Sequence, residues 1–350
     1  MVGFDASIVE GGILVRTFAG ILCLVALAFP QPAASDVYVS DTISMFVPGR
    51  AQDLGPSRYQ YTQLPTPPGA RYKLTANTSG DLRVMLCDAH NLRRLQSGQG
   101  HRCFQKKRKG RFTVTGQLGR SSAMYAVVKN ENVVVSKSAW WRAQVVFPAP
   151  KDFTRETRTS LEKMMAKLHE GLRFPEFDLM VKPCGQVNAF STVRTGDITL
   201  CTELIFDAVQ DQNKAAFMMI LFHELGHTLL NLWGEPNYGN ERTADEFATV
   251  FALIARRPEL VRDWIRWFQE NKDLANEIRA ARGGDLHMLT PQRVEAIQRV
   301  LDRPTRTIQR WTRTIYPHMT NAGLRDVLQN GHPGDNPELA RDILHERGAL

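Results

Sequence analysis

The stretch His223-Glu224-Leu225-Gly226-His227 is the feature from which the rest of this sequence can be interpreted. On a helix, residues four apart lie on one face and are separated by roughly 6 Å along the axis. Both imidazoles can therefore reach one metal ion, with Glu224 beside it. Zinc held in this way lowers the pKa of a bound water to about 7, and a neighbouring glutamate can accept the proton of that water. The motif predicts a zinc-dependent peptidase site, and the alternative is a set of satisfied polar groups in a helix core.

The residues around the motif predict a buried helix over residues 214–233. Asp211 is a candidate N-cap, Gly234 offers a left-handed stop, and Pro236 follows just beyond it. Residues 215–222 are apolar on every side, which is typical of a core helix. Because burying two histidines and a glutamate is costly unless they bind something, this context favours a metal site.

A catalytic zinc needs a third protein ligand and one open position. The segment that begins at Asn240 predicts a second helix, on which Glu241 and Asp245 lie one above the other. We predict Glu241 as the third zinc ligand. Asp245 would support the cofactor by accepting the spare ring N–H of a ligating histidine. The alternative is that these acids, with Glu246, only complement the dipole at the start of the helix.

The pattern His-Glu-x-x-His at 223–227 followed by Glu-x-x-x-Asp at 241–245 resembles the gluzincin metallopeptidases. The nearer similarity is to the branch that contains CAAX prenyl protease-like enzymes and a family of secreted bacterial metallopeptidases. Three more segments carry the resemblance: Asn-Ala-Phe at 188–190, the strand region that follows at 197–204, and His-x(4)-Gln-Arg at 287–293. The resemblance implies a bound zinc ion, a peptide or protein substrate, and a strand near 187–190 that pairs with the extended substrate.

The resemblance also implies a role for His287, which would bind substrate or stabilise the tetrahedral oxyanion as a catalytic residue. Asp285 would orient it. The alternative for this stretch is simply the start of a helix, with Thr290 as N-cap and Pro291 at the first helical position.

The N-terminal sequence predicts export. Residues 18–29 form an apolar run of 12 residues, Arg16 precedes it, and small residues with a candidate cleavage site near Ala34 or Ser35 follow. The run is short for a membrane span, so we expect membrane association only if the signal is kept as an anchor. The sequence therefore predicts a signal peptide over residues 1–35 and a periplasmic or secreted protein.

Four cysteines remain after the predicted signal peptide, Cys87, Cys103, Cys184 and Cys201. In an oxidising compartment an even number of cysteines predicts disulfides. Among the three possible connectivities, Cys87–Cys103 with Cys184–Cys201 fits the predicted division into domains best. Each bridge would close a loop of about 16–17 residues and stabilise the fold by roughly 3 kcal/mol. A zinc site made of these cysteines is not favoured, because the chain has no Cys-x-x-Cys spacing.

The formal net charge is +8, and residues 105–111 form one dense basic run. Such a run can bind nucleic acid, but neither an aromatic stacking pattern nor a DNA-binding motif accompanies it. We therefore expect no nucleic-acid partner. The run is interpreted as a solvated loop or as a patch that meets anionic envelope surfaces.

The chain as a whole predicts an α+β fold with two domains. Residues 36–148 predict a β-rich accessory domain, small and β-sandwich-like, and residues 149–350 a zincin-like metallopeptidase domain, mainly helical with a small sheet. The expected strands are Leu82–Leu86, Arg111–Val114, Met124–Val128, Val133–Val135 and Gln144–Phe147. The expected helices besides the two at the motif are Arg158–Leu172, Pro258–Ala281, Pro291–Leu301 and Pro337–Glu346.

These patterns together predict a zinc-dependent metalloendopeptidase that acts in the periplasm or outside the cell. His223, His227 and Glu241 would hold the zinc, and Glu224 would act as general base and then as general acid. One alternative is a non-catalytic secreted zinc-binding or scaffold protein, and another is a regulatory peptidase limited to one substrate. The intact Glu224 argues against the first alternative, because a structural metal site does not need it.

Overall fold

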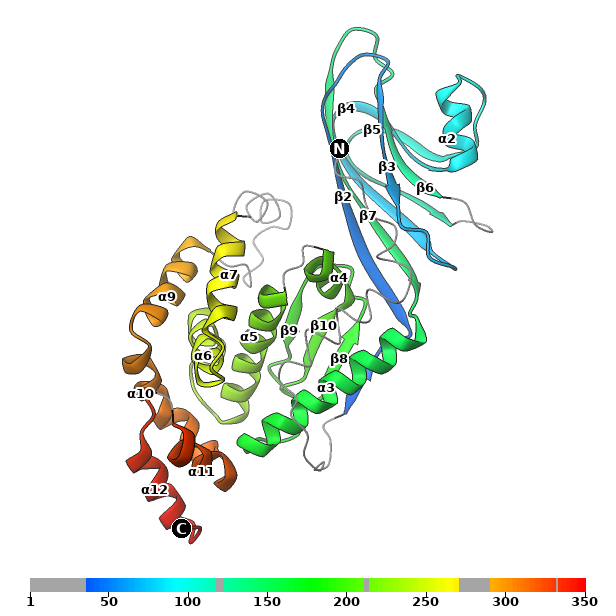
Figure 1. Cartoon of the computed structure of the whole chain (residues 1–350). Coiled ribbons are helices and arrows are strands. Elements are labelled where there is room, and N and C mark those ends of the chain that lie inside the picture. The colour runs from blue at the N-terminus through cyan, green and yellow to red at the C-terminus, as the bar shows by residue number, and fades with distance from the viewer. Residues whose placement is uncertain (1–35, 118–122, 211–213, 271–289, 332) are drawn as a thin grey trace.

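The computed structural model describes residues 36–117, 123–210, 214–270, 290–331 and 333–350 (Figure 1). It is a mixed structure of two β-sheets and many helices. The predicted signal peptide over residues 1–35 and the candidate N-cap Asp211 lie outside these residues, so both stay predictions.

The strands between residues 42 and 148 form one antiparallel sheet with the order β2-β7-β4-β6-β3, and β5 pairs with the other edge of β4. The strands are β2 (Thr42–Leu54), β3 (Tyr59–Leu64), β4 (Arg71–Asp88), β5 (Phe104–Gln117), β6 (Met124–Lys129) and β7 (Lys137–Pro148). β4 is 18 residues long, and one of its edges pairs first with β7 and then with β6. The expected β-sandwich is therefore wrong. Alternation of apolar residues shows which face of a strand is buried but not which strands pair.

Three local expectations for this sheet are also wrong. β2 has 13 residues and was not among the expected strands, which began at Leu82. The basic run 105–111 belongs to β5, so its interpretation as a loop is wrong, while residues 104–109 are exposed and the interpretation as a surface patch stays a prediction. Val133–Val135 forms an exposed bend and not a strand, because the side-chain oxygen of Asn132 accepts the N–H groups of Val134 and Val135, each at 2.8 Å.

The second sheet has four short strands in the order β1-β8-β10-β9. They are β1 (Val37–Val39), β8 (Leu179–Lys182), β9 (Ala189–Ser191) and β10 (Ile198–Cys201). β1, β8 and β10 are parallel, and β9 runs antiparallel to β10 at the edge. β1 belongs to this sheet although the accessory domain was expected to begin at residue 36, so the chain crosses between the two sheets. An edge strand lies at the Asn-Ala-Phe segment.

Helices pack on the second sheet and continue to the C-terminus (Figure 1). α3 packs against β1, while α5 packs against β9 and β10. The helices are α2 (Ala89–Gln96), α3 (Lys151–Gly171), α4 (Thr202–Gln210), α5 (Lys214–Leu232), α6 (Glu241–Ile254), α7 (Pro258–Glu270), α9 (Pro291–Asp302), α10 (Pro304–Ile315), α11 (Asn321–Asn330) and α12 (Pro337–Glu346). Thr290 caps α9 through its side chain, as predicted. The sequence did not predict α2, α4, α10 or α11.

One continuous hydrophobic core joins the first sheet to the helical part. The ring of Phe206 in α4 lies 6.2 Å from that of Phe147 in β7 and 5.9 Å from that of Phe153 in α3. Beside this cluster the Thr202 hydroxyl accepts the N–H of Ser44 at 3.0 Å and donates to its carbonyl at 3.1 Å. The β-rich sheet is thus anchored to the helices by apolar packing and by buried hydrogen bonds.

α5 is the central helix of this core. The window Ala215–Leu232 is long and apolar enough to cross a membrane, but 78% of it is buried inside the protein. It was the only such window found in the part of the chain that the structure describes. α5 is therefore a core helix, as the sequence predicts.

Two disulfides have the predicted pairing. Cys87–Cys103 has a Cα–Cα distance of 4.6 Å and Cys184–Cys201 one of 5.3 Å. The second bridge ties the loop before β9 to the end of β10. Disulfides persist in oxidising compartments, so both bridges are compatible with an extracellular or periplasmic protein.

Candidate metal centre

The end of α5 and the start of α6 place the motif residues together. Gly234 ends α5 in the left-handed region with φ +76°. The N–H of Glu235 then bonds the carbonyl of Leu230 at 2.9 Å, which closes the C-terminus of the helix. After a short turn the side chain of Asn240 accepts the N–H groups of the first turn of α6. Glu241 is therefore the first residue of α6 and lies beside the two histidines.

Gly226 allows α6 to approach α5 closely at this point. A Cβ atom at residue 226 would lie 3.1 Å from Cδ1 of Phe247 and 3.3 Å from the carbonyl oxygen of Ala244. Contacts this short force a neighbour to move, so a larger residue would push the two helices apart. The glycine inside the motif thus sets the distance between the two histidines and Glu241.

The three predicted metal ligands converge in space. Nε2 of His223 lies 3.1 Å from Nε2 of His227 and 3.2 Å from Oε2 of Glu241. Nε2 of His227 lies 3.4 Å from Oε1 of the same carboxylate. One ligand atom from each residue can be chosen so that all three lie within 4.8 Å of one another. Two imidazoles and one carboxylate are a usual ligand set of catalytic zinc sites.

The opposite ring nitrogen of each histidine is held by a separate group. Nδ1 of His227 lies 2.6 Å from the carbonyl oxygen of Tyr238, in the turn between α5 and α6. Nδ1 of His223 lies 2.9 Å from Oδ1 of Asp245. Both acceptors favour the tautomer that carries its proton on Nδ1, so Nε2 of each ring is left to bind a metal.

Arg293 of α9 completes this support. It donates to both oxygens of Asp245, from Nε at 2.6 Å and from a terminal nitrogen at 2.7 Å, and its other terminal nitrogen lies 3.2 Å from Glu241. The side chain of Asp245 is only 2% exposed and that of Arg293 11%. A two-pronged guanidinium–carboxylate pair of this kind fixes both position and orientation.

Burial and charge shift the pKa values at the centre in opposite directions. Burial alone would lower the pKa of His223, but its interactions with Asp245 and Glu241 outweigh burial and raise the pKa to about 9. Burial raises the pKa of Asp245, but hydrogen bonds from Arg293 and His223 hold it below its usual value. A metal cation at His223 would therefore replace a proton and leave Asp245 ionised beside it.

Glu224 is buried, with 1% of its surface exposed. Its Oε2 has no hydrogen-bond partner among the residues that the structure describes. A buried carboxylate oxygen without a partner is costly unless a ligand, an ion or water satisfies it. Together with the convergence of two imidazoles and a carboxylate, this makes the site fit a bound metal ion.

A second cluster of possible ligand atoms does not form a metal site. Cys184, Cys201 and Glu203 lie close together, but the two sulfurs are joined in the disulfide. The carboxylate of Glu203 accepts the backbone N–H groups of Cys184 at 3.1 Å and of Gly185 at 2.8 Å. Its role is to fix the loop that carries the disulfide.

Comparison with known protein families supports the assignment of the metal centre at the junction of α5 and α6. Residues 151–299 match the model of a family described as "Putative metallopeptidase". The match runs from α3 into α9, covers less than half of the chain, and includes every residue of the candidate centre. It supports a metallopeptidase domain in this part of the chain. No curated protein matches the sequence.

The structure leaves two predicted site residues untested and adds two groups that the sequence did not predict. His287 and Asp285 lie outside the described residues, so their predicted roles stay predictions. Arg293 and the carbonyl of Tyr238 were missed. Arg293 ends the His-x(4)-Gln-Arg segment, which was the only sequence signal that pointed to it. The Tyr238 carbonyl gave no signal at all, because a backbone group carries no residue type.

Proposed function

We propose that this protein is a zinc-dependent metalloendopeptidase, with a zinc ion held by His223, His227 and Glu241. The observation that carries the proposal is the convergence of these three side chains beside Glu224, a buried carboxylate with an oxygen that no described residue satisfies. A purely structural metal site would not need that carboxylate. The family match over residues 151–299 supports the same class of reaction.

Zinc bound there would polarise the scissile carbonyl and lower the pKa of the attacking water. In this mechanism Glu224 accepts the proton of that water and later donates it to the leaving amine nitrogen. Asp245 keeps the proton of His223 on Nδ1, and Arg293 keeps Asp245 in place. Each of these side chains thus has one task, which is either to hold the site in place or to move a proton.

The position of β9 supports an extended substrate. β9 lies at the edge of its sheet and packs beside α5, the helix that carries the two histidines. The free edge of such a strand can pair with a peptide through backbone hydrogen bonds. Backbone pairing on both sides of the scissile bond favours cleavage inside a chain, which is the basis for proposing an endopeptidase. His287 is proposed to assist by binding substrate or the oxyanion.

We further propose that the protein acts in the periplasm or outside the cell, where its two disulfides would persist. The alternatives to a general endopeptidase are a zinc-binding scaffold without activity and a peptidase limited to one substrate.

The direct test is digestion of a diverse peptide library by the zinc-loaded protein, followed by mass spectrometry of the products. The variant E224Q is the matched control, since it keeps shape and zinc but cannot take a proton. We expect cleavage by the wild type and loss of at least about a hundredfold in rate in the variant. Equal cleavage by both proteins would refute the role of Glu224. Bound zinc without cleavage of any library peptide would favour the scaffold or the single-substrate peptidase.

A further inference from the structure

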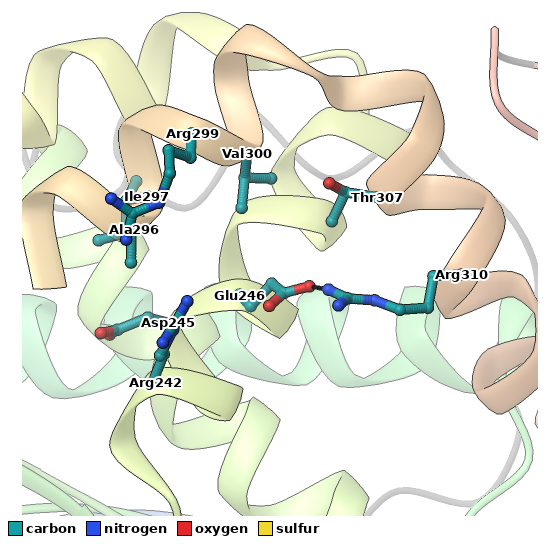
Figure 2. Close-up of a pocket in the computed structure, with 9 residues that line it drawn as sticks. All are labelled: Arg242, Asp245, Glu246, Ala296, Ile297, Arg299, Val300, Thr307 and Arg310. Carbon is teal, nitrogen blue, oxygen red and sulfur yellow. Dashed lines mark ion pairs between the residues drawn. The ribbon is translucent and has the colours of Figure 1, made fainter.

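A small pocket lies where α6, α9 and α10 meet, and Figure 2 shows the side chains that line it. Its volume is about 160 Å³. Arg242 and Glu246 reach it from α6, Arg299 from α9 and Arg310 from α10. The three arginines are exposed, so the pocket is open to a ligand from solvent.

The two acids of the pocket are already paired with cations. Asp245 binds Arg293 through both of its oxygens, at 2.6 and 2.7 Å. Glu246 accepts a hydrogen bond from the ring nitrogen of Trp311 at 2.8 Å and forms an ion pair with Arg310, marked by the dashed line in Figure 2. Neither carboxylate therefore neutralises the positive charges of the other two arginines of the pocket, Arg242 and Arg299.

Arg242 and Arg299 form no ion pair or side-chain hydrogen bond with any residue that the structure describes. Arg299 lies in the last turn of α9, where the helix dipole alone favours a cation. Arg242 lies in the first turn of α6, one residue after Glu241, where the dipole disfavours a cation. The position of Arg299 is therefore favourable for a solvated surface arginine. The position of Arg242 is unfavourable for one, and an anion bound in the pocket would offset that unfavourable interaction.

We propose that this pocket binds a phosphate group, carried by inorganic phosphate or by a phosphate monoester. A phosphate monoester has a charge of about −1.5 to −2 at pH 7, which matches the two unbalanced guanidinium groups. The planar fork of an arginine fits two oxygens of such a group, and Arg242 and Arg299 approach the pocket from different helices. The inference goes beyond the proposed peptidase activity and requires neither a bound metal nor hydrolysis.

The test is calorimetric titration of the full chain with inorganic phosphate, with metals removed so that a metal ion cannot recruit the anion. The double variant R242Q/R299Q removes both unbalanced charges. The matched control is R341Q, which changes an exposed arginine of α12 whose side chain forms no ion pair or hydrogen bond within the described residues. We expect one phosphate per chain on the wild type and on R341Q, competition by sulfate, and binding at least about tenfold weaker in the double variant.

Thermal unfolding gives a second readout and shows whether the variants fold. Without phosphate the double variant should unfold at about the same temperature as the wild type, because losing a cation from the first turn of α6 and losing one from the last turn of α9 have opposite effects on stability. Phosphate should raise the Tm of the wild type but not that of the double variant. Tighter binding of glycerol phosphate than of inorganic phosphate would identify a monoester as the ligand, and the reverse order would identify free phosphate. Absence of phosphate binding by the wild type, or equal affinity in the double variant, would overturn the proposal.

Discussion

Replacing Arg293 with methionine tests the support behind His223. Methionine keeps most of the aliphatic volume but removes both hydrogen bonds to Asp245, whose side chain is 2% exposed. A hydrogen bond to a charged group contributes about 1.5–3 kcal/mol, and removing one partner of a buried pair costs about 3–5 kcal/mol. His223 lies 2.9 Å from the same carboxylate and compensates in part, so we expect the lower end, about 3 kcal/mol.

The assay is equilibrium urea unfolding of the metal-free protein with its disulfides intact. For a slope of about 2–3 kcal/mol/M, a loss of 3 kcal/mol lowers the midpoint by about 1–1.5 M. In phosphate-free buffer the control R299M, an exposed arginine on the same helix, should shift the midpoint little. The zinc affinity of R293M should also fall by about 10–100-fold, because Asp245 no longer fixes the ring of His223. If R293M matched R299M in both stability and zinc affinity, the ion pair of Arg293 with Asp245 would have no supporting role.

Three further outcomes follow from the structure. E241A should lose its zinc, since only two ligands remain, and unchanged stoichiometry by metal analysis would move the third ligand elsewhere. G226A should cost about 1–3 kcal/mol in unfolding free energy and weaken zinc binding, because the new methyl group would press on Phe247 at 3.1 Å; native zinc affinity would count against the close-approach role. The pair of Glu131 with Arg83 titrates in acid. The hydrogen bond from Arg83 lowers the pKa of Glu131 from 4.5 to about 2. Since the folded-state pKa is depressed, its stabilisation, about 1 kcal/mol for a surface pair, is present above pH 4.5 and lost as the pH falls through 2. E131Q should therefore be less stable than the wild type at pH 6, and the difference should disappear below pH 2; a constant difference would refute the pairing.

The candidate centre was predictable from the sequence because its geometry is local. His223 and His227 share one helix face, and Glu241 and Asp245 share the face of the next helix, after a turn that ends at the cap Asn240. Spacing along helices therefore carried most of the information. The contact of Arg293 with Asp245 spans 48 residues and depends on how α9 packs on α6. No periodic pattern in the sequence predicts the contact between these two residues.

The β-rich region was predicted less well for a related reason. Alternating burial identified several strands correctly, since it reflects one buried face. It could not show that β4 pairs with two strands along one edge, so one branched sheet was taken for a sandwich. Val133–Val135 illustrates the same weakness at short range: β-branched residues favour a strand, but the side chain of Asn132 captures their N–H groups and makes a bend.

The proposed function depends on a single metal site at the junction of α5 and α6. A crystal of the protein loaded with one equivalent of zinc, measured on both sides of the zinc absorption edge, would locate the ion directly. We expect one anomalous peak per chain, about 2.0–2.2 Å from Nε2 of His223, from Nε2 of His227 and from the carboxylate of Glu241. A peak at any other place, or no peak at these three residues, would contradict the account.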